Sequence, residues 1–185
     1  MFDSTLMDRV VNKYNITSIY DPCAGWGERM LYCYHNDIDY HGVDINTSLK
    51  NGYDNMMHDF NMIDQHILFE DSACYVPDFE ADAVITCPPY GSLEKYSDAG
   101  AEQLSSEDFL KWWSQVVINA KYAGIKYFCF QINQAMKESM TAVVEHCGFK
   151  LIDELTFDFV KSGHFTRRNG LNKKREYESM LVFTQ

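Results

Sequence analysis

Apolar and polar residues alternate along the chain in short blocks that predict helices and strands in turn. Leu6, Val10, Val11 and Tyr14 recur with helical spacing, whereas short apolar runs that end in glycine, proline or an acid predict strands. Gly148 is typical of a helix C-terminus. The predicted helices cover residues 3–14, 26–36, 47–57, 106–122 and 135–147. The predicted strands cover residues 18–23, 40–45, 66–70, 81–86, 125–131, 149–159 and 177–184.

Helices between successive strands predict a mainly parallel sheet with helices on both faces. The last two predicted strands have no helix between them, so we expect them to pair as an antiparallel hairpin. The sequence therefore predicts one α/β domain over residues 1–185, a doubly wound three-layer sandwich whose seven-stranded sheet has an antiparallel edge strand. Ligands of such sheets bind beyond the carboxyl ends of the strands, which places the chemistry after residues 20, 44, 70 and 87.

Composition narrows the class of protein. The 185 residues are 46% hydrophobic and carry a net charge of −11, which excludes a wholly basic nucleic-acid-binding protein. No apolar run reaches the ~18 residues of a membrane span, and the N-terminus lacks the basic segment followed by an apolar segment that is typical of a signal peptide. The six scattered cysteines predict a reduced, cytoplasmic setting. Neither the cysteines nor the histidines have metal-ligand spacing, so we expect no metal.

A glycine-containing loop follows the first strand, where residues 21–27 read DPCAGWG. Gly25 and Gly27 allow a sharp turn and a close approach of the backbone to a ligand. The third glycine of the dinucleotide-binding fingerprint is missing. Taken alone, the loop is explained equally well as a tight turn from strand to helix.

Carboxylates end the next two strands. Asp44, followed by Ile45, is placed to accept hydrogen bonds from ribose hydroxyls. Asp71, followed by Ser72, could accept a hydrogen bond from an adenine amine. Each aspartate could instead cap a following helix.

The fourth strand ends in the tetrapeptide CPPY at residues 87–90. Two prolines cannot continue a central strand, and they hold their carbonyl groups in set directions. Tyr90 could stack on a flat substrate, or the tetrapeptide could be a rigid turn. The polar stretch 91–105 that follows is either a lid over the substrate or an ordinary loop.

Together the four strand ends resemble the class I S-adenosylmethionine-dependent methyltransferases, and among them those that modify exocyclic amines of adenine or cytosine in DNA. The resemblance extends from Ile19 to the final strand and implies a Rossmann-like methyltransferase fold with S-adenosyl-L-methionine as cofactor. The cofactor-binding residues that it implies are Asp21, Cys23, Ala24, Gly25, Gly27, Asp44, Ile45, Asp71 and Ser72. The catalytic residues that it implies are Cys87, Pro88, Pro89 and Tyr90.

Cys87 departs from the family pattern, which has Asp, Asn or Ser at this position. A thiol is only a weak hydrogen-bond acceptor. Cys87 is therefore a tolerated replacement, a sign of a different acceptor group, or a nucleophile like that of enzymes that methylate carbon-5 of pyrimidines.

A basic segment at residues 161–175 holds six of the sixteen Lys and Arg residues and no acid. It lies between the last two predicted strands, and it could contact nucleic-acid phosphates or be a solvated hairpin tip. The candidate phosphate contacts are Lys161, Arg167, Arg168, Lys173, Lys174 and Arg175.

We therefore predict a compact, phage-like DNA amino-methyltransferase without a separate target-recognition domain. Its specificity would come from short loops or from a protein partner. The alternatives are a methyltransferase acting on RNA or on protein glutamine, and a catalytically silent S-adenosylmethionine-binding module of a larger assembly.

Overall fold

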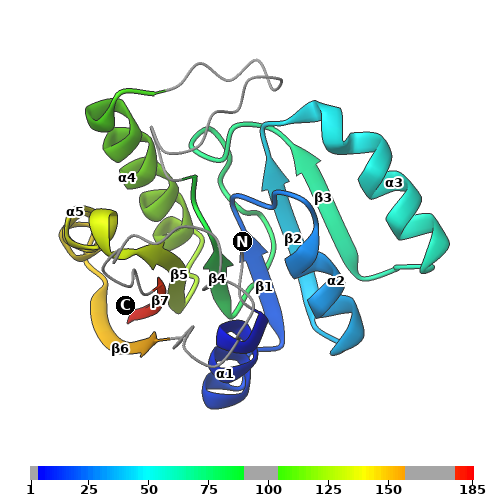
Figure 1. Ribbon diagram of the computed structural model, residues 1–185, viewed down its shortest axis with the longest axis horizontal. Helices are drawn as coiled ribbons and strands as arrows, with labels where there is room; N and C mark the ends of the chain where they lie inside the picture. The colour runs from blue at the N-terminus through cyan, green and yellow to red at the C-terminus, as the bar shows by residue number, and fades with distance from the viewer. Residues whose placement is uncertain (1–3, 90–103, 157–177) are drawn as a thin grey trace, which may run out of the picture.

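The computed structural model describes residues 4–89, 104–156 and 178–185, which form a seven-stranded sheet with helices on both faces (Figure 1). The strands are β1 (Ser18–Asp21), β2 (Asp39–Asp44), β3 (Gln65–Phe69), β4 (Ala83–Thr86), β5 (Tyr127–Asn133), β6 (Lys150–Thr156) and β7 (Glu178–Thr184). The helices are α1 (Ser4–Tyr14), α2 (Glu28–His35), the 3-10 turn η1 (Thr47–Leu49), α3 (Lys50–Asp59), α4 (Ser106–Tyr122) and α5 (Gln134–His146). Each of these elements lies within a few residues of its predicted place.

The strand order is β3-β2-β1-β4-β5-β7-β6. All pairings from β3 to β5 are parallel, whereas β7 runs antiparallel to both β5 and β6. The predicted doubly wound sheet is confirmed, as is the antiparallel pairing of the edge strand β6 with β7. The reversed strand β7 itself lies second from the edge, because it inserts between β5 and β6.

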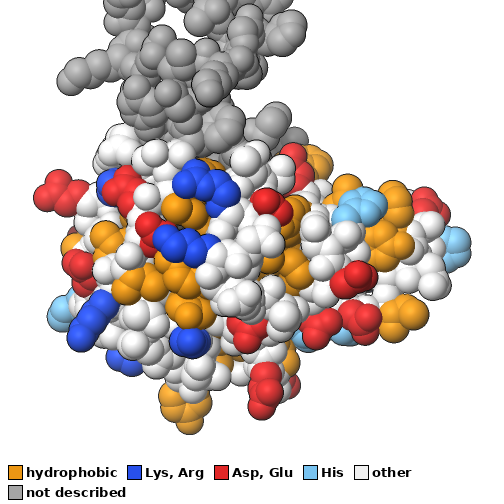
Figure 2. Space-filling view, turned by 90° about the horizontal axis from the view of Figure 1, so that it is seen from below, with side chains coloured by type: hydrophobic (Ala, Val, Ile, Leu, Met, Phe, Trp, Pro, Cys, Tyr) orange, Lys and Arg blue, Asp and Glu red, His pale blue; other side chains and the backbone are white. Residues whose placement is uncertain are grey.

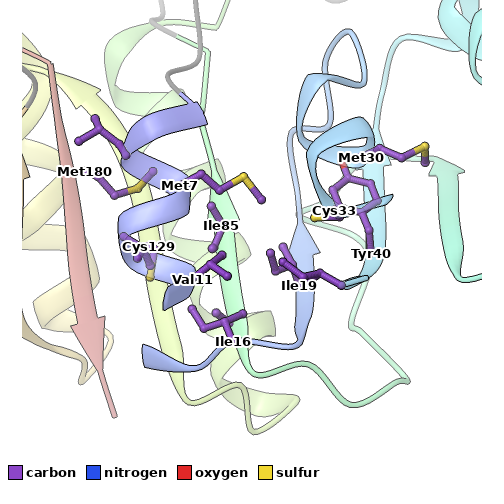
Figure 3. Packing of buried hydrophobic residues seen from close by; sticks show 14 of the residues in the cluster. Met7, Val11, Ile16, Ile19, Met30, Cys33, Tyr40, Ile85, Cys129 and Met180 are labelled. Carbon is purple, nitrogen blue, oxygen red and sulfur yellow. The ribbon is translucent and has the colours of Figure 1, made fainter. Parts of the chain in front are cut away.

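The two faces of the sheet pack against different helices. Side chains of α1, α2 and α3 cover one face, where Ile19 and Ile85 point (Figure 3). Side chains of α4 and α5 cover the other face, where Tyr20 and Val84 point. Successive residues of one strand thus point into opposite cores, because side chains alternate between the two faces of a sheet. This arrangement gives the predicted three layers.

The helices end in one recurring way. After each of the five α-helices, a residue at positive φ precedes an apolar residue whose N–H bonds to the carbonyl five positions earlier. This is the Schellman motif, which satisfies carbonyl groups at a helix end. The positive-φ residues are Asn15, Asp37, Asn61, Gly124 and Gly148.

Surface charge is distributed unevenly. Residues 30–89 contain eleven acids and a single basic residue, Lys50. In Figure 2 the part of the surface over α2 and α3 shows acidic and histidine side chains, whereas Lys and Arg gather over the other half. Within the described residues, no helix is long and apolar enough to cross a membrane.

Candidate active site

The residues that follow β1, β2, β3 and β4 meet at one edge of the sheet. These four strands are neighbours and run parallel, so their carboxyl ends lie side by side (Figure 1). The glycine loop, both carboxylates and the first three residues of the CPPY segment therefore come together as predicted. Tyr90 and residues 91–103 lie outside the described residues.

The glycine loop folds back over the end of β1. Gly25 and Gly27 have φ values of 61° and 84°, in the left-handed region that favours glycine. A Cβ atom on Gly27 would lie 2.9 Å from Met56 Cε, so the loop also approaches α3 closely. The N–H of Ala24 donates to the carbonyl of Val43 at 3.0 Å, which fastens the loop to β2.

Asp44 holds the loop through its carboxylate. Oδ2 accepts the N–H of Gly25 at 2.7 Å, and Oδ1 accepts the N–H of Asn46 at 2.8 Å. Burial raises the pKa of Asp44, although these two hydrogen bonds oppose the rise. The alternative of a helix cap is wrong for Asp44, because the side chain of Asn46 caps η1 by accepting the N–H of Ser48 at 3.1 Å.

Asp21 is fully buried, and the protein itself satisfies its carboxylate. Oδ2 accepts Arg29 Nε at 2.6 Å and the Tyr40 hydroxyl at 2.7 Å. Oδ1 accepts the Thr86 hydroxyl at 2.8 Å and the N–H of Cys23 at 3.2 Å. The resemblance implied that Asp21 touches the cofactor, whereas its burial and its four donors make it an organiser of the loop.

Sequence reasoning missed Arg29, which is 5% exposed. Its guanidinium pairs with Asp21 and also donates to the backbone carbonyl of Cys23. Burial alone would lower the pKa of Arg29, but Asp21 more than reverses this effect, so Arg29 is charged. The available signal was a basic residue in the first turn of a helix directly after the glycine loop.

Asp71 and Ser72 anchor the segment after β3. Asp71 Oδ1 accepts the N–H of Ala73 at 2.9 Å and Trp112 Nε1 at 2.8 Å, and the indole was not expected from the sequence. The buried hydroxyl of Ser72 donates to the carbonyl of Pro22. Ser72 thus joins this segment to the glycine loop and does not face the surface.

The CPPY segment begins where β4 ends. Pro88 is buried, Cys87 and Pro89 are partly exposed, and Cys87 packs against the core under α4 and α5. Thr86, the last residue of β4, is fully buried and bonded to Asp21. The segment therefore leaves the sheet beside the glycine loop.

The residues at the sheet edge fit a cofactor that carries a sugar and a flat ring. Each Asp44 oxygen keeps a further lone pair for a hydroxyl donor. Ile45, which follows, has a 54% exposed apolar side chain on which a ring can rest. The described residues hold no cluster of three or more potential metal ligands.

The candidate nucleic-acid contacts fall outside the described residues. They are Lys161, Arg167, Arg168, Lys173, Lys174 and Arg175, and their role stays a prediction.

The fold is that of the S-adenosylmethionine-dependent methyltransferases. The chain is similar to the methyltransferase domain of bacterial CtHen1-CN, with 13% identity, a TM-score of 0.68 and coverage of 97% of this chain and 95% of that chain. It is also similar to an S-adenosylmethionine-dependent methyltransferase from Clostridium acetobutylicum, with 11% identity, a TM-score of 0.65 and coverage of 98% and 89%. Magnesium protoporphyrin IX methyltransferase from Synechocystis, solved with bound S-adenosylmethionine, has 11% identity, a TM-score of 0.65 and coverage of 99% and 77%.

The family follows from the sequence match. Residues 4–151, well over half of the chain, match the family model of the N-6 DNA methylases, and the chain belongs to this family. No curated protein matches the chain. The protein is thus a methyltransferase whose cofactor is S-adenosyl-L-methionine.

Proposed function

We propose that the protein transfers the methyl group of S-adenosylmethionine to an exocyclic amine of adenine or cytosine in DNA. The observation that carries this proposal is the Cys87-Pro88-Pro89 segment at the end of β4. This segment lies beside the glycine loop of β1 in a chain that belongs to the N-6 DNA methylases.

The cofactor side of the site would be formed by three strand ends. Asp44 would accept hydrogen bonds from the ribose hydroxyls, and Ile45 would support the adenine ring. Asp71 would accept a hydrogen bond from the adenine amine, through carboxylate lone pairs that the N–H groups of Ala73 and Trp112 do not occupy. When bound, S-adenosylmethionine supplies an electrophilic methyl group on sulfur.

The acceptor side would orient a poor nucleophile. The lone pair of an exocyclic amine is delocalised into the ring, so the enzyme must favour a tetrahedral nitrogen. The carbonyl of Pro88 would accept an amine hydrogen, because the prolines hold it in a fixed direction. Tyr90 would stack on the base, which must leave the duplex or come from a single strand.

Transfer forms a nitrogen–carbon bond as the sulfur–carbon bond breaks, and the amine then loses one proton to water. Alignment of the methyl carbon with the nitrogen would supply most of the rate enhancement. In this proposal Cys87 replaces the usual Asp, Asn or Ser without attacking the base, and backbone carbonyls accept the hydrogens.

Charge directs where DNA would dock. The acidic surface over α2 and α3 repels phosphates (Figure 2). The basic segment 161–175 would bind them instead.

Replacing Lys173, Lys174 and Arg175 with Gln should weaken DNA binding and flatten its salt dependence, whereas Lys126→Gln should change neither. An unchanged salt slope in the triple variant would contradict this docking site.

The acceptor is tested with labelled S-adenosylmethionine against duplex DNA, single-stranded DNA, RNA and a protein extract. We expect label in DNA, on N6 of adenine or N4 of cytosine after digestion to nucleosides. Label confined to RNA or to protein glutamine would overturn the proposed substrate. Pro89→Ala should abolish transfer, with Pro77→Ala as the matched control outside the site.

A further inference from the structure

We infer that the buried ion pair of Asp21 and Arg29, together with Thr86, is a positioning device that aligns the glycine loop with the catalytic segment. This inference rests on the proposed catalytic role of residues 87–89. The three residues come from β1, α2 and β4, and none of them was expected to act together with the others.

Arg29 supports the glycine loop from inside the protein. Its Nε donates to Asp21 Oδ2 at 2.6 Å, and its guanidinium also donates to the carbonyl of Cys23. The guanidinium therefore connects the end of β1 with the loop that follows it. Because a guanidinium is planar and its donors are fixed in direction, it restricts the orientation of this loop as well as its distance.

Asp21 extends this hydrogen-bonded connection to β4. Its Oδ1 accepts the hydroxyl of Thr86 at 2.8 Å, and Thr86 directly precedes Cys87. A path of hydrogen bonds thus runs from Cys23 through Arg29, Asp21 and Thr86 to the start of the catalytic segment. Each link along it joins fully or nearly fully buried side chains, apart from the backbone at Cys23.

A purely apolar core could hold these elements together without buried charges, which are costly to desolvate. Asp21 pairs with Arg29 directly, and Asp44 at the end of β2 also interacts with Arg29 electrostatically. Burial, reinforced by Asp21, raises the pKa of Cys23, so this thiol is neutral and does not compete for Arg29. The ion pair therefore fixes the position of the glycine loop relative to the catalytic segment, where cofactor and acceptor would meet.

A positioning role predicts a particular kinetic signature. Small misalignments of reacting atoms slow group transfer far more than they weaken binding. Loss of the link should therefore lower kcat while the KM for S-adenosylmethionine stays nearly constant.

Thr86→Val tests this signature with little change in shape. We expect kcat to fall about tenfold or more, with the KM for S-adenosylmethionine within about threefold of wild type. Thr86→Ser, which keeps the hydroxyl, should restore kcat. Thr141→Val is the matched control, since the Thr141 hydroxyl is buried without a partner on α5 among the described residues, and it should leave kcat unchanged.

Arg29→Lys provides a second test, because it keeps the charge but loses the planar donor set. It should show the same selective loss of kcat, with activity expressed per S-adenosylmethionine-binding site so that unfolded protein does not count. Wild-type kcat in Thr86→Val would overturn the inference. So would a loss of activity that only follows the loss of folded protein.

Failure of the positioning role can be distinguished from failure of the proposed function. The kinetic comparison uses whichever acceptor the labelling experiment identifies, so an RNA or protein acceptor would refute the DNA proposal and still allow this test. Hydrogen exchange at the amides of Cys23 and Cys87 needs no turnover. Faster exchange at both amides in Thr86→Val is expected, and unchanged exchange would contradict the positioning link.

Discussion

Replacing Asp44 with alanine tests the cofactor site most directly. The carboxylate accepts the N–H of Gly25 at 2.7 Å and the N–H of Asn46 at 2.8 Å, so its loss releases both the glycine loop and the turn after β2. It would also remove the proposed acceptor of two ribose hydroxyls. The cofactor would thus lose its own contacts and the ordered loop beside them.

The expected magnitude follows from these contacts. A hydrogen bond to a charged group contributes about 1.5–3 kcal/mol, so loss of two to the ligand amounts to about 3–6 kcal/mol. This corresponds to a weakening of affinity by a factor of roughly 10² to 10⁴. The fold should survive, because Asp44 is only partly buried and burial already opposes its ionised form.

Isothermal titration calorimetry with S-adenosylmethionine measures this loss, and thermal unfolding checks that each variant is folded. Asp54→Ala is the control, since Asp54 is exposed on α3 and pairs with Lys50 at 3.0 Å. A folded Asp44→Ala variant that binds the cofactor with wild-type affinity would refute the assignment of the site.

The pKa of Asp44 adds a pH dependence to the same experiment. Burial raises this pKa above its ordinary value of 3.8, so ionisation of Asp44 costs stability as pH rises through the folded-state pKa. Hydroxyl donors favour the carboxylate, so cofactor affinity should fall as pH drops through that pKa. Titrations from about pH 7 to about pH 4 should show this fall in wild type and not in Asp44→Asn. A flat wild-type profile would contradict it.

Three further predictions concern the glycine loop, the contact of Asp82 with the start of β1, and the proposed catalytic segment. Gly27→Ala places a Cβ atom 2.9 Å from an α3 side chain at a φ of 84° and should cost about 1–3 kcal/mol in urea unfolding, whereas Gly52→Ala, with open space around it, should not destabilise. Burial alone would raise the pKa of Asp82, but hydrogen bonds from Thr17 and Ser18 outweigh it and lower this pKa. The stability that the Asp82 carboxylate contributes is therefore present above its ordinary pKa of 3.8 and is lost as pH falls through the lowered pKa. Asp82→Asn should therefore lose about 1 kcal/mol at neutral pH and match wild type in acid; an equal loss at both would be inconsistent with this. Cys87→Ser should retain or raise methyl transfer to the amine, and its inactivity would favour a nucleophilic Cys87 instead.

Local sequence patterns were sufficient to predict the helices and strands and the strand ends at which the candidate site lies. Apolar periodicity predicted the helix at 106–122, and Ser105 caps this helix by accepting the N–H of Asp108 at 3.1 Å. Strand ends marked by Asp44 and Asp71 were likewise found at one sheet edge. These features depend on residues close in sequence, which is why a single chain reveals them.

The pairing of the last strands needed the tertiary structure. The hairpin of β6 and β7 was predicted, but the sequence did not show which of them would pair with β5. In the fold, β7 carries Leu181 and Val182 into the two cores and pairs along the whole of β5, leaving β6 at the edge. This choice depends on the burial of both strand faces, and β6 is mostly exposed.

By itself the sequence predicted a doubly wound methyltransferase fold in which a glycine loop, two carboxylates and the Cys87-Pro88-Pro89 segment follow the ends of four strands. Only the tertiary structure decided that Asp21 is an internal anchor. Its donors Arg29, Tyr40 and Thr86 lie 8, 19 and 65 positions away in the chain. A carboxylate can bind a ligand only if its neighbours leave it accessible, and those neighbours are brought together by folding.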